Sequence, residues 1–255
     1  MHASRGRPHT LALGIWLASR GALVVTGLVL SAIGAVAACV EAVAGTRWKG
    51  AALPAIAAHA IAWGAGVTVA FGAALHAVRR DRAEGVVALA RARGANAADY
   101  VRGRVGGLIA VLAIAVGGGT LASGIAATSV AHPALATARA TVGALAYSLA
   151  FAATLGPVAL AALGARSRGT GYLALLAVVV IPELLSPWTS ALLPHGWNEL
   201  TSIPAALDAI GSGAASPIHG AMHLLRGLAM LAAVVGASLV VVAAQVSRVD
   251  PRNAA

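Results

Sequence analysis

The feature that most constrains this chain is a series of long apolar blocks. Five blocks of about twenty or more mostly apolar residues lie at 22–40, 51–78, 105–130, 140–164 and 227–246. Charged residues are only 10% of the chain, whereas about a quarter of the residues in an ordinary soluble domain are charged. Because about 20 apolar residues in a helix cross a bilayer, we expect an all-α polytopic membrane protein. We expect residues 1–255 to form one transmembrane domain.

A sixth apolar block, fifth in chain order, is less regular. It is apolar over 172–181 and is then interrupted by two prolines and two polar residues. These are Pro182, Glu183, Ser186 and Pro187. Proline removes a backbone donor and disrupts a helix interior, so this block predicts a short or broken span. The total is then about six spans.

The basic residues indicate the orientation of these spans. Fourteen of the 18 fall on one side of a six-span arrangement and four on the other. The first set is Arg5, Arg7, Arg20, Arg79, Arg80, Arg82, Arg91, Arg93, Arg102, Arg104, Arg166, Arg168, Arg248 and Arg252; the second is Arg47, Lys49, Arg139 and Arg226. Short positive loops stay in the cytoplasm, so we expect a cytoplasmic (inner) membrane protein with both termini cytoplasmic. The basic residues form no aromatic-interleaved stripe, which excludes nucleic acid as a partner.

Residues 1–20 combine an apolar set with flanking arginines. The apolar residues are Leu11, Leu13, Ile15, Trp16 and Leu17, and they lie between Arg7 and Arg20. Tryptophan prefers headgroup depth, and arginine favours anionic lipid. The pattern fits a helix lying in the membrane interface, and it equally fits an ordered lead-in to the first span.

The longest polar segment on the expected cytoplasmic side is 79–104. A short apolar patch within it, 86–90, predicts a short helix that ends at Gly94. Asn96, with Asp99 three residues later, has the pattern of a helix N-cap and would start the third span. A short helix held under the membrane suits a soluble docking partner, and the alternative is a solvated basic loop.

Two stretches of this loop resemble a known family. Residues 80–85 read RDRAEG, and after the short apolar helix residues 98–104 read ADYVRGR and run into a span. This pattern resembles the inner loop of the permeases of type-2 ABC exporters. The layout is also similar to that family, with a basic loop at 166–171 and a long outer connection before the last span.

The resemblance implies that the loop carries a coupling helix that docks on a separate ATP-binding subunit. The contact residues would be Glu84, Gly85, Val87, Leu89 and Arg91. The only lysine, Lys49, lies in no glycine-rich phosphate-binding loop, so ATP and Mg²⁺ are expected on the partner and no cofactor or catalytic residue in this chain. Six spans are half of the family's translocation unit, which implies a second permease copy or homologue.

The outer connection at 186–223 is too apolar for a free loop. Within it, 201–210 predicts a short helix with Ser202 as its cap and Pro204 in its first turn. In the resembled family such a segment is re-entrant. The alternative is a loop anchored by its tryptophans in the outer interface.

Ionisable residues at membrane depth are costly and are therefore functional candidates. Pro182 and Glu183 could form a gate or part of the substrate pathway, although Glu183 could instead reach outer water or bond to a neighbouring helix. His59 lies in the second span, and its spacing from His76 does not suit a metal site, so we expect an interhelical hydrogen bond.

Three other classes of protein are alternatives to an exporter permease. An ion-coupled secondary transporter should carry paired ionisable residues in mid-membrane or two matching broken helices. A non-transporting membrane scaffold has no contrary signal in the sequence. An intramembrane enzyme is disfavoured, since the chain has no HExxH motif and no serine–histidine pair in a protease context. Nothing in the spans indicates the substrate.

Overall fold

The computed structural model describes residues 7–45, 51–92, 94–131, 134–165, 168–194 and 197–247. These residues are almost entirely helical, and none of them lies in a β-strand. Six helices are long and apolar enough to cross a membrane, which confirms the expected all-α, multi-pass fold. They cover Ala22–Ala44, Ala52–Ala83, Ala97–Val130, Ala134–Leu163, Gly169–Thr189 and Gly220–Ser247.

The six spans and their connections account for all the labelled helices. Span 1 is α2 (Ala22–Ala44), preceded by α1 (Arg7–Ala18). Span 2 contains α3 (Ala52–Ala60), α4 (Val67–Ala74) and α5 (Ala77–Ala83), and α6 (Val86–Ala92) follows it. Span 3 combines α7 (Ala97–Leu112) and α8 (Gly118–Val130), and span 4 is α9 (Ala134–Leu163). Span 5 contains α10 (Arg168–Leu175) and α11 (Ile181–Leu192), and α12 (Ile203–Ala215) precedes α13 (Pro217–Ser247), which carries span 6.

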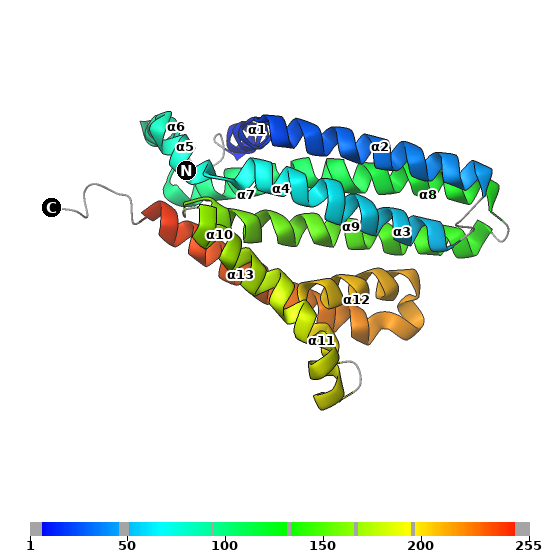
Figure 1. Cartoon of the computed structure of the whole chain (residues 1–255). Coiled ribbons are helices and arrows are strands. Elements are labelled where there is room, and N and C mark those ends of the chain that lie inside the picture. Colours follow the sequence, from blue (N-terminus) through cyan, green and yellow to red (C-terminus); the bar gives the residue numbers. More distant parts are fainter. Residues whose placement is uncertain are drawn as a thin grey trace, which may run out of the picture.

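Spans 1 to 4 lie side by side in one bundle, and spans 5 and 6 diverge from it (Figure 1). The helix α9 is the most buried span and packs against helices of spans 2 and 3 as well as α12 and α13. Small and hydroxyl side chains hold it closely, as where the Thr120 and Ser148 hydroxyls hydrogen-bond at 2.8 Å. Close packing of small residues and hydrogen bonds between helices hold membrane helices together, because lipid removes the hydrophobic driving force for their association.

Three spans contain a π-helical stretch, at Ile61–Gly66, Ala113–Gly117 and Leu176–Val180. The stretch at Leu176–Val180 explains how span 5 accommodates Pro182. Pro182 lies in the first turn of α11, directly after the π-helical residues, where a missing backbone donor costs little. Span 5 is therefore helical through Pro182, and α11 also continues past Pro187, which lies inside it, to Leu192. The sequence predicted a short or broken helix at these two prolines.

The outer connection is shorter than the sequence predicted, because α11 continues to Leu192 and α13 begins at Pro217. Between them lie a 3₁₀ turn at Asn198–Leu200 and the helix α12. The Ser202 hydroxyl accepts a hydrogen bond from the Ala205 N–H at 3.1 Å, and proline stands in the first turn, which confirms the predicted cap. The helix α12 runs beside α13 within the length of the spans (Figure 1).

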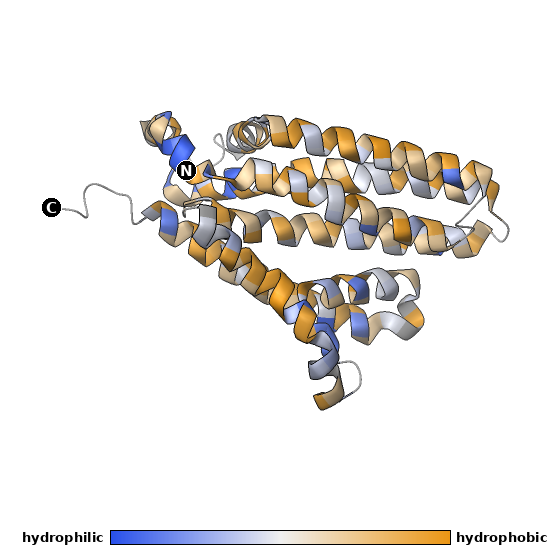
Figure 2. Ribbon diagram, viewed as in Figure 1, coloured by the Kyte–Doolittle hydropathy of each residue, from blue (hydrophilic) through white to orange (hydrophobic). Residues whose placement is uncertain are grey.

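Polar residues gather in two regions of an otherwise apolar surface. Figure 2 shows hydrophilic colour on α5, at the end of the molecule where the described chain begins and ends, and again where α11 meets α12. The outward faces of the spans carry large apolar side chains, as expected for helices solvated by lipid. These two polar regions contain the residues predicted for docking and for the substrate pathway.

Candidate functional site

The helices α5 and α6 form a hairpin that projects beyond the bundle next to α1 (Figure 1). A break in span 2 separates this hairpin from α4, since His76 has a φ of 55°. Its backbone N–H bonds to the Leu163 carbonyl at 3.1 Å, and the Val78 N–H bonds to that of Gly164 at 3.0 Å. The hairpin is therefore a separate unit docked on the end of α9.

Glycines in the left-handed region bound the helix α6. Gly85 has a φ of 70° and turns the chain from α5 into α6, while Gly94 has a φ of 81° and follows its end. The Asn96 side chain then accepts from the Asp99 N–H at 2.8 Å, and the Asp99 carboxylate accepts from the Asn96 N–H at 3.3 Å. This capping box starts α7, so the predicted short helix and the predicted cap are both confirmed.

A buried charge cluster fixes α5 to the start of span 3. Asp81 is fully buried, and Arg104 is only 2% exposed. The Arg104 Nε lies 3.1 Å from Asp81 Oδ2, and the Tyr100 hydroxyl donates to the same oxygen at 2.6 Å. A buried charge without a partner would cost several kcal/mol, so these three residues hold α5 against α7.

Two further contacts tie the hairpin to the rest of the molecule. Arg20, at the junction of α1 and α2, pairs with Glu84 at 2.9 Å, and its guanidinium lies 3.3 Å from the ring centre of Trp16. Arg82 donates to the Gln245 carbonyl at 2.9 Å. Displacing the hairpin would therefore also disturb α1 and α13.

The five residues predicted to dock a partner have different surroundings. Glu84 holds Arg20, Gly85 forms the turn, and Val87 packs half-buried against the core. The Leu89 side chain is 55% exposed at the tip of the molecule. The side chain of Arg91 lies outside the described part of the structure. Leu89 is thus the apolar member of this set that remains open to a partner.

The second polar region contains the predicted pathway residues. Pro182 and Glu183 lie in the first turn of α11, and the Glu183 carboxylate accepts a hydrogen bond from the Ser202 hydroxyl at 2.7 Å. Since Ser202 also caps α12, this bond joins span 5 to the start of α12. His223 of α13 pairs with the Glu199 carboxylate next to it.

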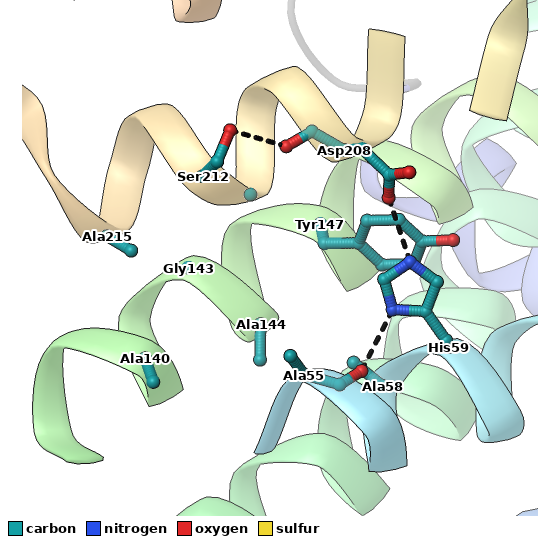
Figure 3. A pocket seen from close by; sticks show the side chains of 11 residues that line it. Ala55, Ala58, His59, Ala140, Gly143, Ala144, Tyr147, Asp208, Ser212 and Ala215 are labelled. Carbon is teal, nitrogen blue, oxygen red and sulfur yellow. Dashed lines mark hydrogen bonds and ion pairs between the residues drawn. The ribbon is translucent and has the colours of Figure 1, made fainter. Parts of the chain in front are cut away.

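Sequence reasoning missed a third cluster, which surrounds His59. The His59 Nε2 lies 2.8 Å from Asp208 Oδ1 on α12, and its ring stacks on Tyr147 with centroids 4.2 Å apart (Figure 3). The Trp63 N–H donates to the Tyr147 hydroxyl at 2.7 Å. The predicted interhelical hydrogen bond of His59 is confirmed. Asp208 is an acidic residue within the mostly apolar helix α12, and this position alone could have identified it as a functional candidate.

A scan of protein-family models, a search of curated proteins and a search of solved structures each found no match to this chain.

Proposed function

We propose that this chain is the transmembrane permease subunit of an ATP-driven ABC exporter and moves a substrate across the cytoplasmic membrane. ATP and Mg²⁺ bind a separate ATP-binding subunit, and a second permease copy or homologue completes the translocation unit. Both termini and the α5–α6 hairpin lie in the cytoplasm in this arrangement, as the positive-inside distribution of arginine requires.

The observation that carries the proposal is the anchoring of the α5–α6 hairpin. A loop that only solvates the end of a bundle needs no buried ion pair, yet Asp81 and Arg104 are both almost fully buried. A partner that pushes on α6 would act through this pair on span 3 and through Glu84 on α1. Rigid connections of this kind are what a docking helix needs in order to transmit movement.

The substitution Leu89→Asp tests the proposal. It places a charge in the centre of the proposed apolar contact, so we expect the affinity for the ATP-binding subunit to fall at least about tenfold, roughly 1.4 kcal/mol. Co-purification of the two subunits and ATP hydrolysis by the reconstituted complex measure the effect. Leu193→Asp is the matched control, because Leu193 is an exposed leucine after α11, distant from the hairpin.

Unchanged association and hydrolysis in the Leu89→Asp variant would contradict the proposal. Absence of any ABC-type ATPase from the purified wild-type complex would also contradict it and would favour a scaffold.

One observation favours a second candidate function, an ion-coupled secondary transporter. His59 and Asp208 form a pair of ionisable residues between a span and the adjacent helix α12, the kind of pair that such transporters use. The same reconstituted vesicles separate the two functions. Transport that needs ATP supports the exporter, whereas transport that persists without ATP and stops when the proton gradient collapses supports the second candidate.

A further inference from the structure

A cavity lies between α3, α9 and α12, in the part of the molecule farthest from the α5–α6 hairpin. Its volume is about 260 Å³, and most of its wall is alanine and glycine, including Ala55, Ala144 and Gly211. The polar lining residues are His59, Tyr147, Asp208 and Ser212. Figure 3 shows His59, Tyr147 and Asp208 together at one end of this wall, with Ala140, Gly143 and Ala215 at the other. The cavity thus has one polar end and one apolar end.

The His59 and Ser212 donors at the polar end are already engaged. The His59 Nδ1 lies 2.9 Å from the Ala55 carbonyl oxygen, which can only accept, and its Nε2 faces Asp208. The Ser212 hydroxyl donates to the Asp208 carbonyl at 2.8 Å. The Tyr147 hydroxyl accepts from Trp63 and points away from the alanine wall (Figure 3). The Tyr147 O–H can still donate but points away from the alanine and glycine wall, so it does not favour an anion against that wall.

Acceptor capacity does remain, on Asp208. One carboxylate oxygen, Oδ1, bonds to His59, and within the described residues the other, Oδ2, has no hydrogen-bond partner. The protein leaves 60% of the Asp208 side chain uncovered, and 44% of His59. His59 faces Oδ1 alone, so Oδ2 can accept a further hydrogen bond from a donor in the cavity.

We propose that this cavity binds a small amphiphilic amine. The ammonium group donates to the Asp208 carboxylate, and the apolar body lies against the alanine and glycine wall. An apolar cavity of roughly 150 Å³ holds benzene, so the larger volume here suits a single ring with a short alkylamine chain. The site belongs to the isolated chain and does not depend on the proposed ATP-binding subunit.

The ammonium group has two sources, a free amine or the headgroup of an aminolipid such as phosphatidylethanolamine. Both present an N–H donor with a positive charge. Phosphatidylcholine carries a quaternary ammonium without an N–H, so a bilayer of that lipid leaves the donor role to an added amine.

Calorimetric titration of the purified chain in phosphatidylcholine nanodiscs tests the proposal, with empty nanodiscs subtracted. The probe is phenethylamine, compared with phenethyl alcohol, which has the same shape but no charge, and with phenylpropionate, which has the opposite charge. We expect the amine to bind at least tenfold more tightly than either analogue. Equal affinity for the amine and the alcohol would overturn the proposal, since this comparison uses the wild-type protein alone.

Paired variants then locate the binding. Asp208→Asn should weaken amine binding at least tenfold, while Glu41→Gln, which removes a carboxylate from span 1, should not. Ala55→Leu should fill the cavity and abolish binding, whereas Ala136→Leu, at an exposed alanine of α9 outside the cavity, should bind as wild type. Undiminished amine binding in Asp208→Asn or Ala55→Leu would overturn the proposal.

Nanodiscs that contain phosphatidylethanolamine separate the two sources. A lower apparent affinity for phenethylamine in them identifies the lipid headgroup as the occupant, because the two ammonium groups compete. An unchanged affinity assigns the site to free amines. Failure of amine binding would leave the Leu89→Asp experiment unaffected, so the two proposals fail independently.

Discussion

At the scale of single residues, Asp81 and Arg104 form an ion pair in which both side chains are buried. A buried ion pair adds little net stability compared with apolar residues, but the loss of one partner is expensive. A mechanical role, holding the hairpin against span 3, would explain why the protein keeps a pair whose desolvation costs free energy. Here it connects the hairpin that projects from the bundle to the start of span 3.

Substitution Arg104→Leu should therefore destabilise the protein by about 3–5 kcal/mol, because it leaves the buried Asp81 carboxylate without its cationic partner. The double variant Asp81→Leu with Arg104→Leu removes both charges and should recover at least half of that loss. Unfolding in mixed detergent micelles measures both. Purely additive losses in the double variant would show that the two residues do not interact.

The sequence was sufficient for single residues wherever the partner is close in the chain. The caps at Asn96 and Ser202 were predicted because each bonds to a residue three positions later. The partner of His59 is 149 residues away, so no local pattern could identify Asp208. Residues that meet only through helix packing are therefore what sequence reasoning missed in the candidate sites.

At the scale of elements, the contact between α1 and α7 shows that a pattern of small residues predicts a helix interface but does not identify the partner helix. A Cβ atom added to Gly14 would lie 1.8 Å from the Gly103 carbonyl oxygen, and one added to Gly107 would lie 2.1 Å from the Gly14 carbonyl carbon. The two backbones therefore touch. Glycines four apart indicate a helix interface. They do not say which helix packs there. The sequence therefore left α1 as either an interfacial helix or a lead-in to span 1, and it did not predict that α1 packs on span 3.

Because of this contact, Gly14→Ala should push α1 away from α7 and destabilise the protein by about 1–3 kcal/mol. Displacing α1 would also loosen Arg20, so we expect faster tryptic cleavage there. Gly118→Ala is the matched control, since nothing lies within 4 Å of its added Cβ. Equal cleavage rates in the two variants would contradict the packing argument.

In span 5, the effect of proline on the helix also could not be predicted from the local sequence. A proline in an apolar block predicts a short or broken helix, because its missing donor normally costs a backbone bond. The π-helical stretch at Leu176–Val180 absorbs that loss and lets the helix continue. Nothing in the residue types of this stretch indicates a π-helix, so its continuity could not be predicted locally.

At the scale of the whole molecule, the number of spans was predictable because it depends on hydrophobicity alone. The described chain starts and ends at the same end of the bundle, where the α5–α6 hairpin also lies (Figure 1). Which face of the membrane this is depends on the distribution of charge outside the spans. From the 14-to-4 distribution of basic residues we propose that this end lies in the cytoplasm.

Single cysteines placed at the two ends test this orientation. The native Cys39 is replaced by alanine, and Ala92→Cys, at the end of α6, is compared with Ala51→Cys, just before α3. In intact cells a membrane-impermeant maleimide should label Ala51→Cys and should label Ala92→Cys only after the membrane is permeabilised. The reverse result would place the hairpin outside the cell, where no ATP-binding subunit could reach Leu89, and would therefore exclude the proposed exporter together with the orientation.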